Sequence, residues 1–473
     1  MNICFVDPKG IHFGLNTGIG YLVSYLKAYY GADRVDVFDF NNNQSDADER
    51  IERISRYDIV GFSVKSFTKD SAVDIARRVK TKNNILIAGG PHVTLDGVNF
   101  LKENEAFDYG IAGEGEISLA GLLKAIELKE DPSLVGGVIR RTADGGVRSA
   151  GHSERIKDLD AMPYPDYGVF DSVRDGNIHN YPVVTSRGCP YLCTYCCVKD
   201  VMGKKWFARS VDNIVGELKD VRKKYNINCF NVQDDNFSLD MKRAKAFCDA
   251  LMKENLSMKW SCPNGIRADR VDEELMAKMR SSGCFAVAMG IESGVESEFA
   301  AIKKGEKLGD IVKAIELAKR NKIWVFGNFI IGLPQSNLES IRESVRFAKK
   351  LDLESCIFNL LVPFPGTEVW DWANKNGRML MDWKDGFTQG KNPRVVFETD
   401  DFTKEERLRA YWEANIKCKN YFACMDEHDS LASNIWSVLK TIALYDLLGA
   451  PGHILWCFRH AGRIMARIFK KNV

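Results

Sequence analysis

The sequence predicts an α/β protein with an N-terminal doubly wound parallel sheet, a partial (β/α)6 barrel and a small helical C-terminal region. Strand-like and helix-like segments alternate up to about residue 125, a second alternating series begins at Tyr181, and the strand signal fades after about residue 376. We therefore expect a first domain at 1–150, a linker at 151–180, the barrel at 181–375 and the helical region at 376–473.

The first series has short apolar strands separated by segments with helical spacing of apolar residues. The expected strands are Asn2–Val6, Val35–Phe40, Ile59–Ser63, Ile85–Ala88 and Tyr109–Ala112, and the expected helices are Tyr21–Tyr30, Ser71–Lys80 and Ile117–Leu128. Glycine follows several of the strands. Because ligands of a Rossmann-like sheet bind at the carboxyl ends of its strands, we expect a ligand crevice there.

The second series follows glycine- and proline-containing segments between 126 and 180, which indicate irregular edge structure and then a linker. Its expected strands are Val183–Ser186, Cys229–Gln233, Lys259–Pro263, Phe285–Met289, Trp324–Ile331 and Cys356–Leu361. Its expected helices are Val211–Tyr225, Arg243–Asn255, Glu273–Ser282, Gly309–Asn321 and Leu338–Leu351. Six repeats are two short of a closed barrel, so we predict an open one. Thr403–Tyr421 and Ser433–Leu447 should be the C-terminal helices.

Composition limits the function classes. The chain has 473 residues, of which 45% are hydrophobic and 27% are charged, so it can bury several cores. The 66 Lys and Arg residues nearly balance the 64 Asp and Glu residues, and we expect no nucleic-acid partner. No signal peptide or apolar stretch long enough for a membrane span is evident. We expect a cytoplasmic protein whose thirteen cysteines stay reduced.

Three of these cysteines are clustered directly after the first predicted barrel strand. The sequence SRGCPYLCTYCC places Cys189, Cys193 and Cys196 at a CxxxCxxC spacing. Three thiolates on one loop can ligate three irons of a [4Fe–4S] cluster and leave the fourth iron open for another ligand. A zinc site that lacks its fourth ligand, or three buried thiols, are the alternatives. Cys197, next to the motif, should pack behind the loop.

Four later segments accompany this motif in order: NVQDDNF at Asn231–Phe237, MGIESG at Met289–Gly294, NFIIGLP at Asn328–Pro334 and PFPGTEVW at Pro363–Trp370. Together with the cysteines they resemble the radical S-adenosylmethionine superfamily. The resemblance implies an S-adenosylmethionine site in which Tyr195 packs against the adenine, Asp234 and Asp235 lie near the methionine part, Glu292 reaches the ribose or amino group and Gly332 lies beside the adenine.

The same resemblance implies the chemistry. An electron donor such as flavodoxin or ferredoxin reduces the cluster, and cleavage of S-adenosylmethionine then gives a 5′-deoxyadenosyl radical that abstracts hydrogen from an unactivated carbon. The cofactors carry this reaction, and the protein positions and shields them.

The N-terminal domain resembles the cobalamin-binding domain of one branch of that superfamily. The matching segments are Asp58–Val64, Ile85–Thr94 and Gly110–Glu116, in which the expected cobalamin-binding residues are Gly61, Ser63, Gly89, Gly90, Gly113 and Glu114. The Asp-x-His-x-x-Gly sequence that supplies a cobalt ligand elsewhere is absent. We therefore expect cobalamin without a protein histidine ligand, and His12 and His92 as ordinary loop residues; a domain that has lost its cofactor is the alternative.

Residues 451–473 contain five basic residues and no acidic one. Arg459, Arg463 and Arg467 recur every four residues, so on a helix they form one basic strip beside apolar residues. This pattern predicts peripheral contact with an anionic membrane, which would suit a lipid-like substrate. A terminal helix docked on the protein is the alternative.

The resulting hypothesis is a cobalamin-dependent radical enzyme that acts on a small-molecule or lipid-like substrate, most simply by C-methylation. A radical cyclase or another rearrangement is the second hypothesis, and a non-catalytic cobalamin-binding sensor is the third.

Overall fold

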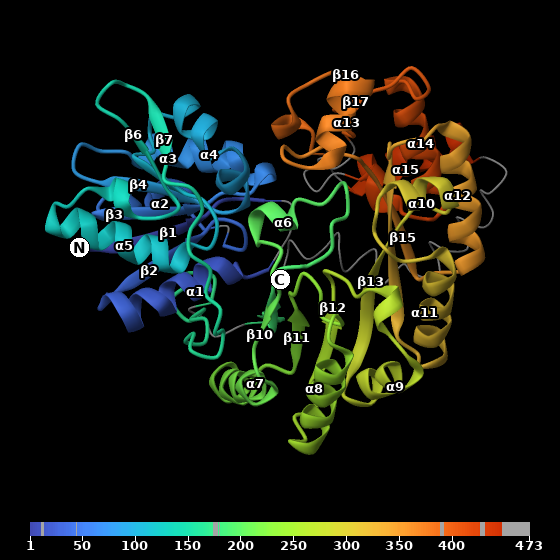
Figure 1. The fold of residues 1–473 in the computed structure, drawn as a ribbon, viewed down its shortest axis with the longest axis horizontal. Coiled ribbons are helices and arrows are strands. Elements are labelled where there is room, and N and C mark those ends of the chain that lie inside the picture. Colours follow the sequence, from blue (N-terminus) through green and yellow to red (C-terminus); the bar gives the residue numbers. More distant parts are fainter. Residues whose placement is uncertain are drawn as a thin grey trace. The chain divides into compact units, whose positions relative to one another are not determined.

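The structure is a computed structural model that describes residues 1–10, 14–43, 45–173, 178, 180–387, 392–425 and 431–446. The chain forms two compact units (Figure 1). Unit one contains residues 1–191, 197–264 and 281–284, and unit two contains 192–196, 265–280 and the residues from 285 onward. The middle of the cysteine motif therefore belongs to unit two.

The N-terminal sheet of unit one has the strand order β2-β1-β3-β4-β5-β6-β7. Its strands are β1 (Ile3–Asp7), β2 (Val35–Asp39), β3 (Ile59–Ser63), β4 (Ile85–Gly89), β5 (Tyr109–Ile111), β6 (Val138–Arg141) and β7 (Val147–Ser149). The first five are parallel and confirm the predicted strands, whereas β6 and β7 form an antiparallel edge. β1 and β2 are buried along their whole length, as parallel strands covered on both faces are.

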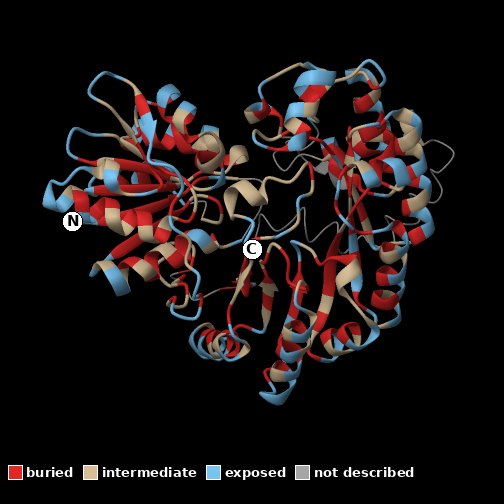
Figure 2. Ribbon diagram, in the orientation of Figure 1, coloured by how far each residue is buried: buried red, intermediate tan, exposed pale blue. Residues whose placement is uncertain are grey.

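Helices connect these strands. They are α1 (Thr17–Tyr25), which continues into the π-helical turn Leu26–Tyr30, α2 (Ala47–Ile54), α3 (Lys69–Val79), α4 (Pro91–Glu103) and α5 (Gly115–Leu128). α2 and α4 were not predicted. In α4 the helical period is interrupted, because Asp96 leaves helical geometry at φ −140°. Figure 2 shows that the sheet interior is buried, and Phe62 and Phe100 each lie 5.2 Å from Phe107, measured between ring centroids.

Unit one also contains the first three barrel strands, which are β8 (Tyr181–Val183), β11 (Cys229–Val232) and β12 (Lys259–Cys262). They are parallel, with β11 between the other two, and α7 (Val211–Tyr225) and α8 (Met241–Lys253) follow β8 and β11. The predicted first strand, Val183–Ser186, was placed too late. The chain leaves this sheet after Val183, because the Thr185 N–H donates its hydrogen bond to the Asp234 carboxylate. β9 (Ser186–Arg187) then pairs antiparallel with β10 (Phe207–Ala208). Between β9 and β10 lies the short helix α6 (Val198–Val201).

Unit two contains the other three barrel strands, β13 (Cys284–Glu292), β14 (Trp324–Ile331) and β15 (Ser355–Leu360), with β14 in the centre. Its helices are α9 (Glu273–Ser281), α10 (Glu296–Ala301), α11 (Leu308–Arg320), α12 (Leu338–Leu351) and α13 (Glu368–Asn376). The register of β13 against β14 shifts between Gly290 and Glu292, so the strand ends in an irregularity. All six predicted barrel strands are therefore present, three in each unit.

The C-terminal region contains α14 (Lys404–Lys417) and α15 (Leu431–Tyr445), which confirm the two predicted helices. A short antiparallel pair, β16 (Arg378–Met379) and β17 (Phe397–Glu398), precedes them, so the region is not entirely helical as predicted. α14 packs along β15, where the Asn415 side chain bonds to both backbone groups of Phe358. Short 3₁₀ turns occur at Ser66–Thr68, Pro132–Leu134, Ala268–Arg270, Trp383–Asp385 and Tyr421–Cys424.

Across the described residues, no helix is both long and apolar enough to cross a membrane. The basic segment 451–473 lies outside the described residues, so its contact with a membrane surface stays a prediction.

Candidate functional site

The cysteine loop begins directly after β9. Cys189 belongs to unit one, whereas Cys193 and Cys196 belong to unit two, and all three are partly buried. In unit two a turn brings the Cys196 N–H to 3.1 Å from the Cys193 carbonyl. In unit one the Asn236 amide lies 3.9 Å from Cys189 Sγ, where it can donate a hydrogen bond to the sulfur. The sequence prediction missed Asn236, although it belongs to the NVQDDNF segment.

Two aspartates of that segment fix the chain just before Cys189. The carboxylate of Asp234 accepts hydrogen bonds from Thr185 N (2.6 Å), Thr185 Oγ1 (2.5 Å) and Ser186 Oγ (2.6 Å). Asp235 accepts one from Gly188 N at 2.9 Å, and burial raises the pKa of its carboxyl group. The structure therefore places both predicted residues as anchors for residues 185–188.

Arg187, two residues before Cys189, is held by acidic residues of the N-terminal sheet domain. Its guanidinium forms ion pairs with Glu114 (3.4 Å) and Glu116 (2.7 Å). Glu114 also accepts hydrogen bonds from Arg155 Nε and Ile156 N. The carboxylate of Glu114, which was predicted to bind a cofactor, is thus engaged with the protein in this structure.

In unit two the loop is anchored at Thr194. Its N–H donates to the Ile302 carbonyl, and its carbonyl accepts from Val369 N, both at 3.0 Å. Val369 belongs to the predicted PFPGTEVW segment, and this contact gives the segment a physical role in holding the cysteine loop.

Tyr195 and Glu292, two predicted site residues, meet in unit two. The Tyr195 hydroxyl donates a 2.8 Å hydrogen bond to Glu292 Oε1, which also lies 3.1 Å from Lys304 Nζ. Lys304 pairs with Glu306 at 3.1 Å, and Glu306 pairs with Arg267 at 3.5 Å. A buried chain of alternating charges thus extends from the cysteine loop to the turn that carries Arg267.

Two local features accompany this chain of charges. Glu292 has φ +64°, an uncommon conformation for a residue other than glycine, at the point where the register of β13 shifts. Burial lowers the pKa of Lys304, but Glu292 and Glu306 outweigh burial and raise it overall, so the ammonium stays charged. Lys304 was not predicted, because its neighbour Lys303 looks the same in sequence but is exposed.

Gly332, the predicted residue after β14, has φ +98°, which favours glycine. A side chain at this position would also collide with Nη1 of Arg407 from α14. The residue therefore meets both a backbone and a steric requirement for glycine.

In the N-terminal sheet, Ser63 and Gly89 are register partners at the carboxyl ends of β3 and β4. Ser63 Oγ accepts a 3.0 Å hydrogen bond from Asn16, whose amide also donates to Asp7 at 2.8 Å. Among the described residues other than its chain neighbours, the nearest atom to a Cβ built on Gly89 is the Ile111 carbonyl oxygen at 3.9 Å, which leaves room for a ligand to approach this backbone.

The other predicted glycines of this domain face protein. A Cβ on Gly61 would meet the Phe5 ring, a Cβ on Gly90 would meet the Val64 backbone, and a Cβ on Gly113 would meet Ser153. Gly90 and Gly113 also have positive φ angles. Their conformation and packing account for these glycines without a ligand.

His92, at the start of α4, is fully buried. Its Nδ1 lies 3.0 Å from Ser66 Oγ, and its ring packs edge-on against Phe100. The prediction of a loop residue is therefore wrong, because His92 lies in the first turn of a helix, and the absence of a histidine ligand to cobalt stays a prediction. His12 lies outside the described residues.

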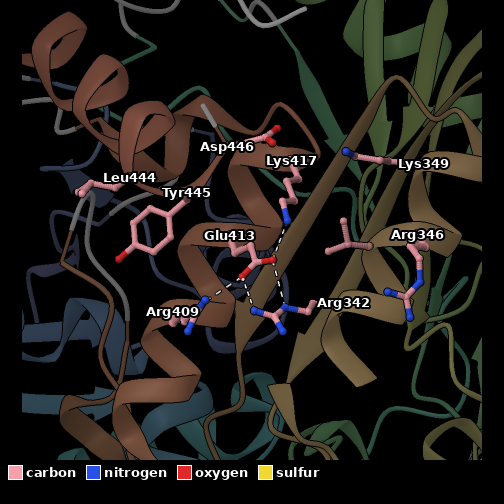
Figure 3. Close-up of a pocket in the computed structure, with 10 residues that line it drawn as sticks. Arg342, Arg346, Lys349, Arg409, Glu413, Lys417, Leu444, Tyr445 and Asp446 are labelled. Carbon is pink, nitrogen blue, oxygen red and sulfur yellow. Dashed lines mark hydrogen bonds and ion pairs between the residues drawn. The ribbon is translucent and has the colours of Figure 1, made fainter. Parts of the chain in front are cut away.

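Two cavities lie in the described part of the chain outside these residues. One, of about 750 Å³, lies in unit two at α12, α14 and the end of α15, and its lining includes Arg342, Arg409 and Glu413 (Figure 3). The other, of about 340 Å³, lies in unit one beside Tyr25 and Tyr29. Neither is lined by a predicted site residue.

Over the ranges that the structure describes, no three His, Cys, Asp or Glu side chains are gathered closely enough to hold a metal ion. The donors of the cysteine loop still fit an iron–sulfur cluster by their chemistry, because cluster iron is ligated by thiolates. The amide of Asn236 adds a hydrogen bond to one sulfur, which is a means by which proteins tune such clusters.

Two family models match the chain. Residues 183–348 match the radical SAM superfamily, and residues 14–123 match the B12 binding domain.

Relatives and solved structures match most of the chain. An uncharacterized methyltransferase of Pyrococcus horikoshii is 29% identical over 87% of this chain and 90% of its own length. The anaerobic magnesium-protoporphyrin IX monomethyl ester cyclase of Rubrivivax gelatinosus is 25% identical over 78% of this chain and 69% of its own. The radical S-adenosylmethionine methyltransferase TsrM of Kitasatospora setae shares the fold, with a TM-score of 0.73, 16% identity and coverage of 94% of this chain and 96% of that chain.

The fold prediction is therefore confirmed, and both predicted domain types are present in one chain. The chain belongs to the cobalamin-dependent radical S-adenosylmethionine enzymes, and its cofactors are a [4Fe–4S] cluster, S-adenosylmethionine and cobalamin.

Proposed function

We propose that this enzyme transfers a methyl group to an unactivated carbon of a small-molecule substrate. The observation that carries the proposal is the presence of a B12-binding domain and a radical SAM domain in one chain, together with 29% identity to a relative named a methyltransferase over 87% of the chain. The cluster with S-adenosylmethionine supplies the radical that removes hydrogen, and cobalamin supplies the methyl group.

We assign the cluster to Cys189, Cys193 and Cys196. Asp234 and Asp235 hold the backbone before Cys189, and Thr194 holds the backbone between the other two cysteines. These contacts keep the loop in one conformation, which a site with only three protein ligands requires.

We place S-adenosylmethionine beside Tyr195, Glu292 and Gly332. Glu292 pairs with Lys304, and its carboxylate oxygens can accept hydrogen bonds from a ribose hydroxyl or an ammonium group. Its hydrogen bond from Tyr195 links this carboxylate to the cysteine loop.

We place cobalamin at the carboxyl ends of β3 and β4, around Ser63 and Gly89. Gly89 leaves room for close approach, and Ser63 Oγ offers a polar contact beside it. Gly61, Gly90, Gly113 and Glu114 support this edge through their contacts with the protein. Cobalamin bound here should show no imidazole ligand from the protein in its absorbance spectrum.

The test of methylation is anaerobic reconstitution with cluster, cobalamin, reductant and methyl-labelled S-adenosylmethionine, followed by addition of a small-molecule extract. A methyltransferase should form S-adenosylhomocysteine and 5′-deoxyadenosine and should label an extract component. Formation of 5′-deoxyadenosine without labelled product or S-adenosylhomocysteine would contradict the proposal.

A radical cyclisation is the second candidate, supported by the 25% identity to the cyclase of Rubrivivax gelatinosus. It predicts a product without an added methyl group. The mass of the product therefore separates the two candidates.

A further inference from the structure

Arg407, on the first turns of α14, has a buried guanidinium against the carboxyl end of a barrel strand. The residue is only 1% exposed. Its Nη1 lies against Gly332, which directly follows β14. Its Cζ lies 4.2 Å from the ring centroid of Phe397 and 4.9 Å from that of Phe402.

This guanidinium lacks an anionic partner within the described part of the chain. Nε donates a 3.0 Å hydrogen bond to the Phe402 carbonyl, and no described carboxylate forms an ion pair with the group. Burial lowers the pKa of Arg407 to about 10, and the attraction of Glu398 offsets only part of this effect. Glu398 itself pairs with Arg378 and accepts a hydrogen bond from Lys404 N.

Two other cations of α14, Arg409 and Lys417, pair with Glu413 of the same helix, as does Arg342 of α12. Figure 3 shows Glu413 among Arg342, Arg409 and Lys417, with Glu413 oxygens 3.2 Å from Arg342 Nε, 3.8 Å from Arg409 Nε and 2.6 Å from Lys417 Nζ. The Glu413 carboxylate of α14 thus neutralises cations that are partly exposed to solvent, whereas the helix provides no carboxylate for the buried Arg407. Because an uncompensated buried charge is destabilising by itself, its presence at Arg407 indicates a role other than stability.

The geometry limits what could neutralise it. Two aromatic rings lie near the guanidinium, and Nε already has an acceptor, so the Nη atoms are the donors without an acceptor in the described part of the chain. A guanidinium edge binds planar or tetrahedral oxyanions through parallel hydrogen bonds. Active sites of barrel enzymes are formed at the carboxyl ends of the strands, where Gly332 lies.

We propose that the Nη edge of Arg407 binds an oxyanion, a carboxylate or phosphate group, of the substrate. The assignment of this oxyanion to the substrate rests on the proposed function, whereas the binding of an anion by Arg407 does not. Anion binding itself can be measured without methyl transfer, so the two proposals can fail separately.

The first test is thermal unfolding of full-length, cluster-loaded protein under anaerobic conditions. Inorganic phosphate and malonate are the probes, each compared with sodium chloride at equal ionic strength. Wild type should be stabilised by one of them, which also tells phosphate from carboxylate. Arg407→Met should lose this stabilisation. Arg407→Lys, which keeps the charge but loses the fork, should bind the same probe about tenfold more weakly.

Arg409→Met is the matched control, because Arg409 lies on the same helix, is mostly exposed and pairs with Glu413. It should respond to the probe as wild type does. Loss of the response in Arg409→Met but not in Arg407→Met would place the anion in the cavity of Figure 3 and overturn the proposal. Equal responses of wild type, Arg407→Lys and Arg407→Met, or no response in wild type, would also overturn it.

The second test identifies the source of the anion. Saturating S-adenosylmethionine should leave the affinity for the probe unchanged if the substrate carries the oxyanion. Competition between the two would assign Arg407 to the carboxylate of the cofactor instead and would overturn the substrate assignment.

Discussion

The hydroxyl of Tyr195 donates a 2.8 Å hydrogen bond to Oε1 of Glu292. The two residues are 97 positions apart in the sequence, and one lies between two cysteines of the motif while the other ends β13. Because of this contact, a displacement of Glu292 at the end of β13 would also displace Tyr195 in the cysteine loop.

Lys304→Met should lower both stability and affinity for S-adenosylmethionine. The substitution leaves Glu292 and Glu306 without the ammonium that lies between them, and breaking a buried ion pair costs about 3–5 kcal/mol. Chemical unfolding and equilibrium binding of S-adenosylmethionine would measure both effects. Lys303→Met is the matched control, because the exposed pair of Lys303 with Glu368 contributes at most about 1 kcal/mol. Similar losses in both variants would contradict the role given to Lys304.

Single replacement of Cys189, Cys193 or Cys196 by alanine should remove the cluster, since each thiolate would ligate one iron. Iron content and visible absorbance of anaerobically reconstituted protein would measure this. Cys197→Ala, the neighbouring cysteine at the start of α6, should keep the cluster. An intact cluster in a variant of the first three would refute the ligand assignment.

Asp234→Asn should reduce cluster loading without removing a ligand. The amide offers one oxygen to three donors, so at least one of the three hydrogen bonds must be lost or reversed in direction, and each buried donor left unsatisfied costs about 1–3 kcal/mol. We expect a lower melting temperature and a lower iron content than in wild type. Asp249→Asn, on the exposed side of α8, provides the control. Full loading of Asp234→Asn would show that residues 185 and 186 hold their conformation without this carboxylate.

Asp7→Asn should stabilise the protein at neutral pH. Burial raises the pKa of Asp7 to about 6, against the opposing effect of Lys65, so the folded state favours the protonated acid. The protonated acid therefore stabilises the folded state at low pH, and this stabilisation is lost as pH rises from about 4 to about 6. Above that range the free energy of unfolding is lower by roughly 3 kcal/mol.

The asparagine cannot ionise and can still accept the hydrogen bond of Asn16. The free energy of unfolding should therefore rise relative to wild type at pH 7.5 and change little at pH 4. Asp33→Asn, at an exposed aspartate before β2, should show no such difference. A variant that is less stable than wild type at pH 7.5 would mean that the charged form of Asp7 is needed.

The fold could be predicted from the sequence because its strands are short, apolar and regularly separated by helices. The errors in the predicted elements lie where side-chain or backbone contacts interrupt this pattern. Thr185 bonds to Asp234 instead of continuing the first barrel strand, and the kink at Asp96 interrupts the helical period of α4. Tyr195 and Glu292 could both be singled out because they lie in segments with a family resemblance, and the structure shows that they contact each other, while their roles toward a cofactor stay predictions.

Lys304 and Arg407 could not be predicted in this way. Each lies in a run of charged residues, Lys303–Lys307 and Lys404–Arg409, in which neighbours of similar chemistry are exposed. Only the packing of the segment between α10 and α11, and of α14, decides which cation is buried, and the local sequence does not show this.

The ion pairs of Arg187 with Glu114 and Glu116 join two segments that match different domain families, the radical SAM superfamily and the B12 binding domain. The arginine lies within the radical SAM match and both glutamates lie within the B12-binding match. A chimera that exchanges one module for that of a relative therefore inherits only half of this junction. Transplants should carry the turn before α5 together with the residues that precede Cys189, and natural recombination between such modules faces the same constraint on charge.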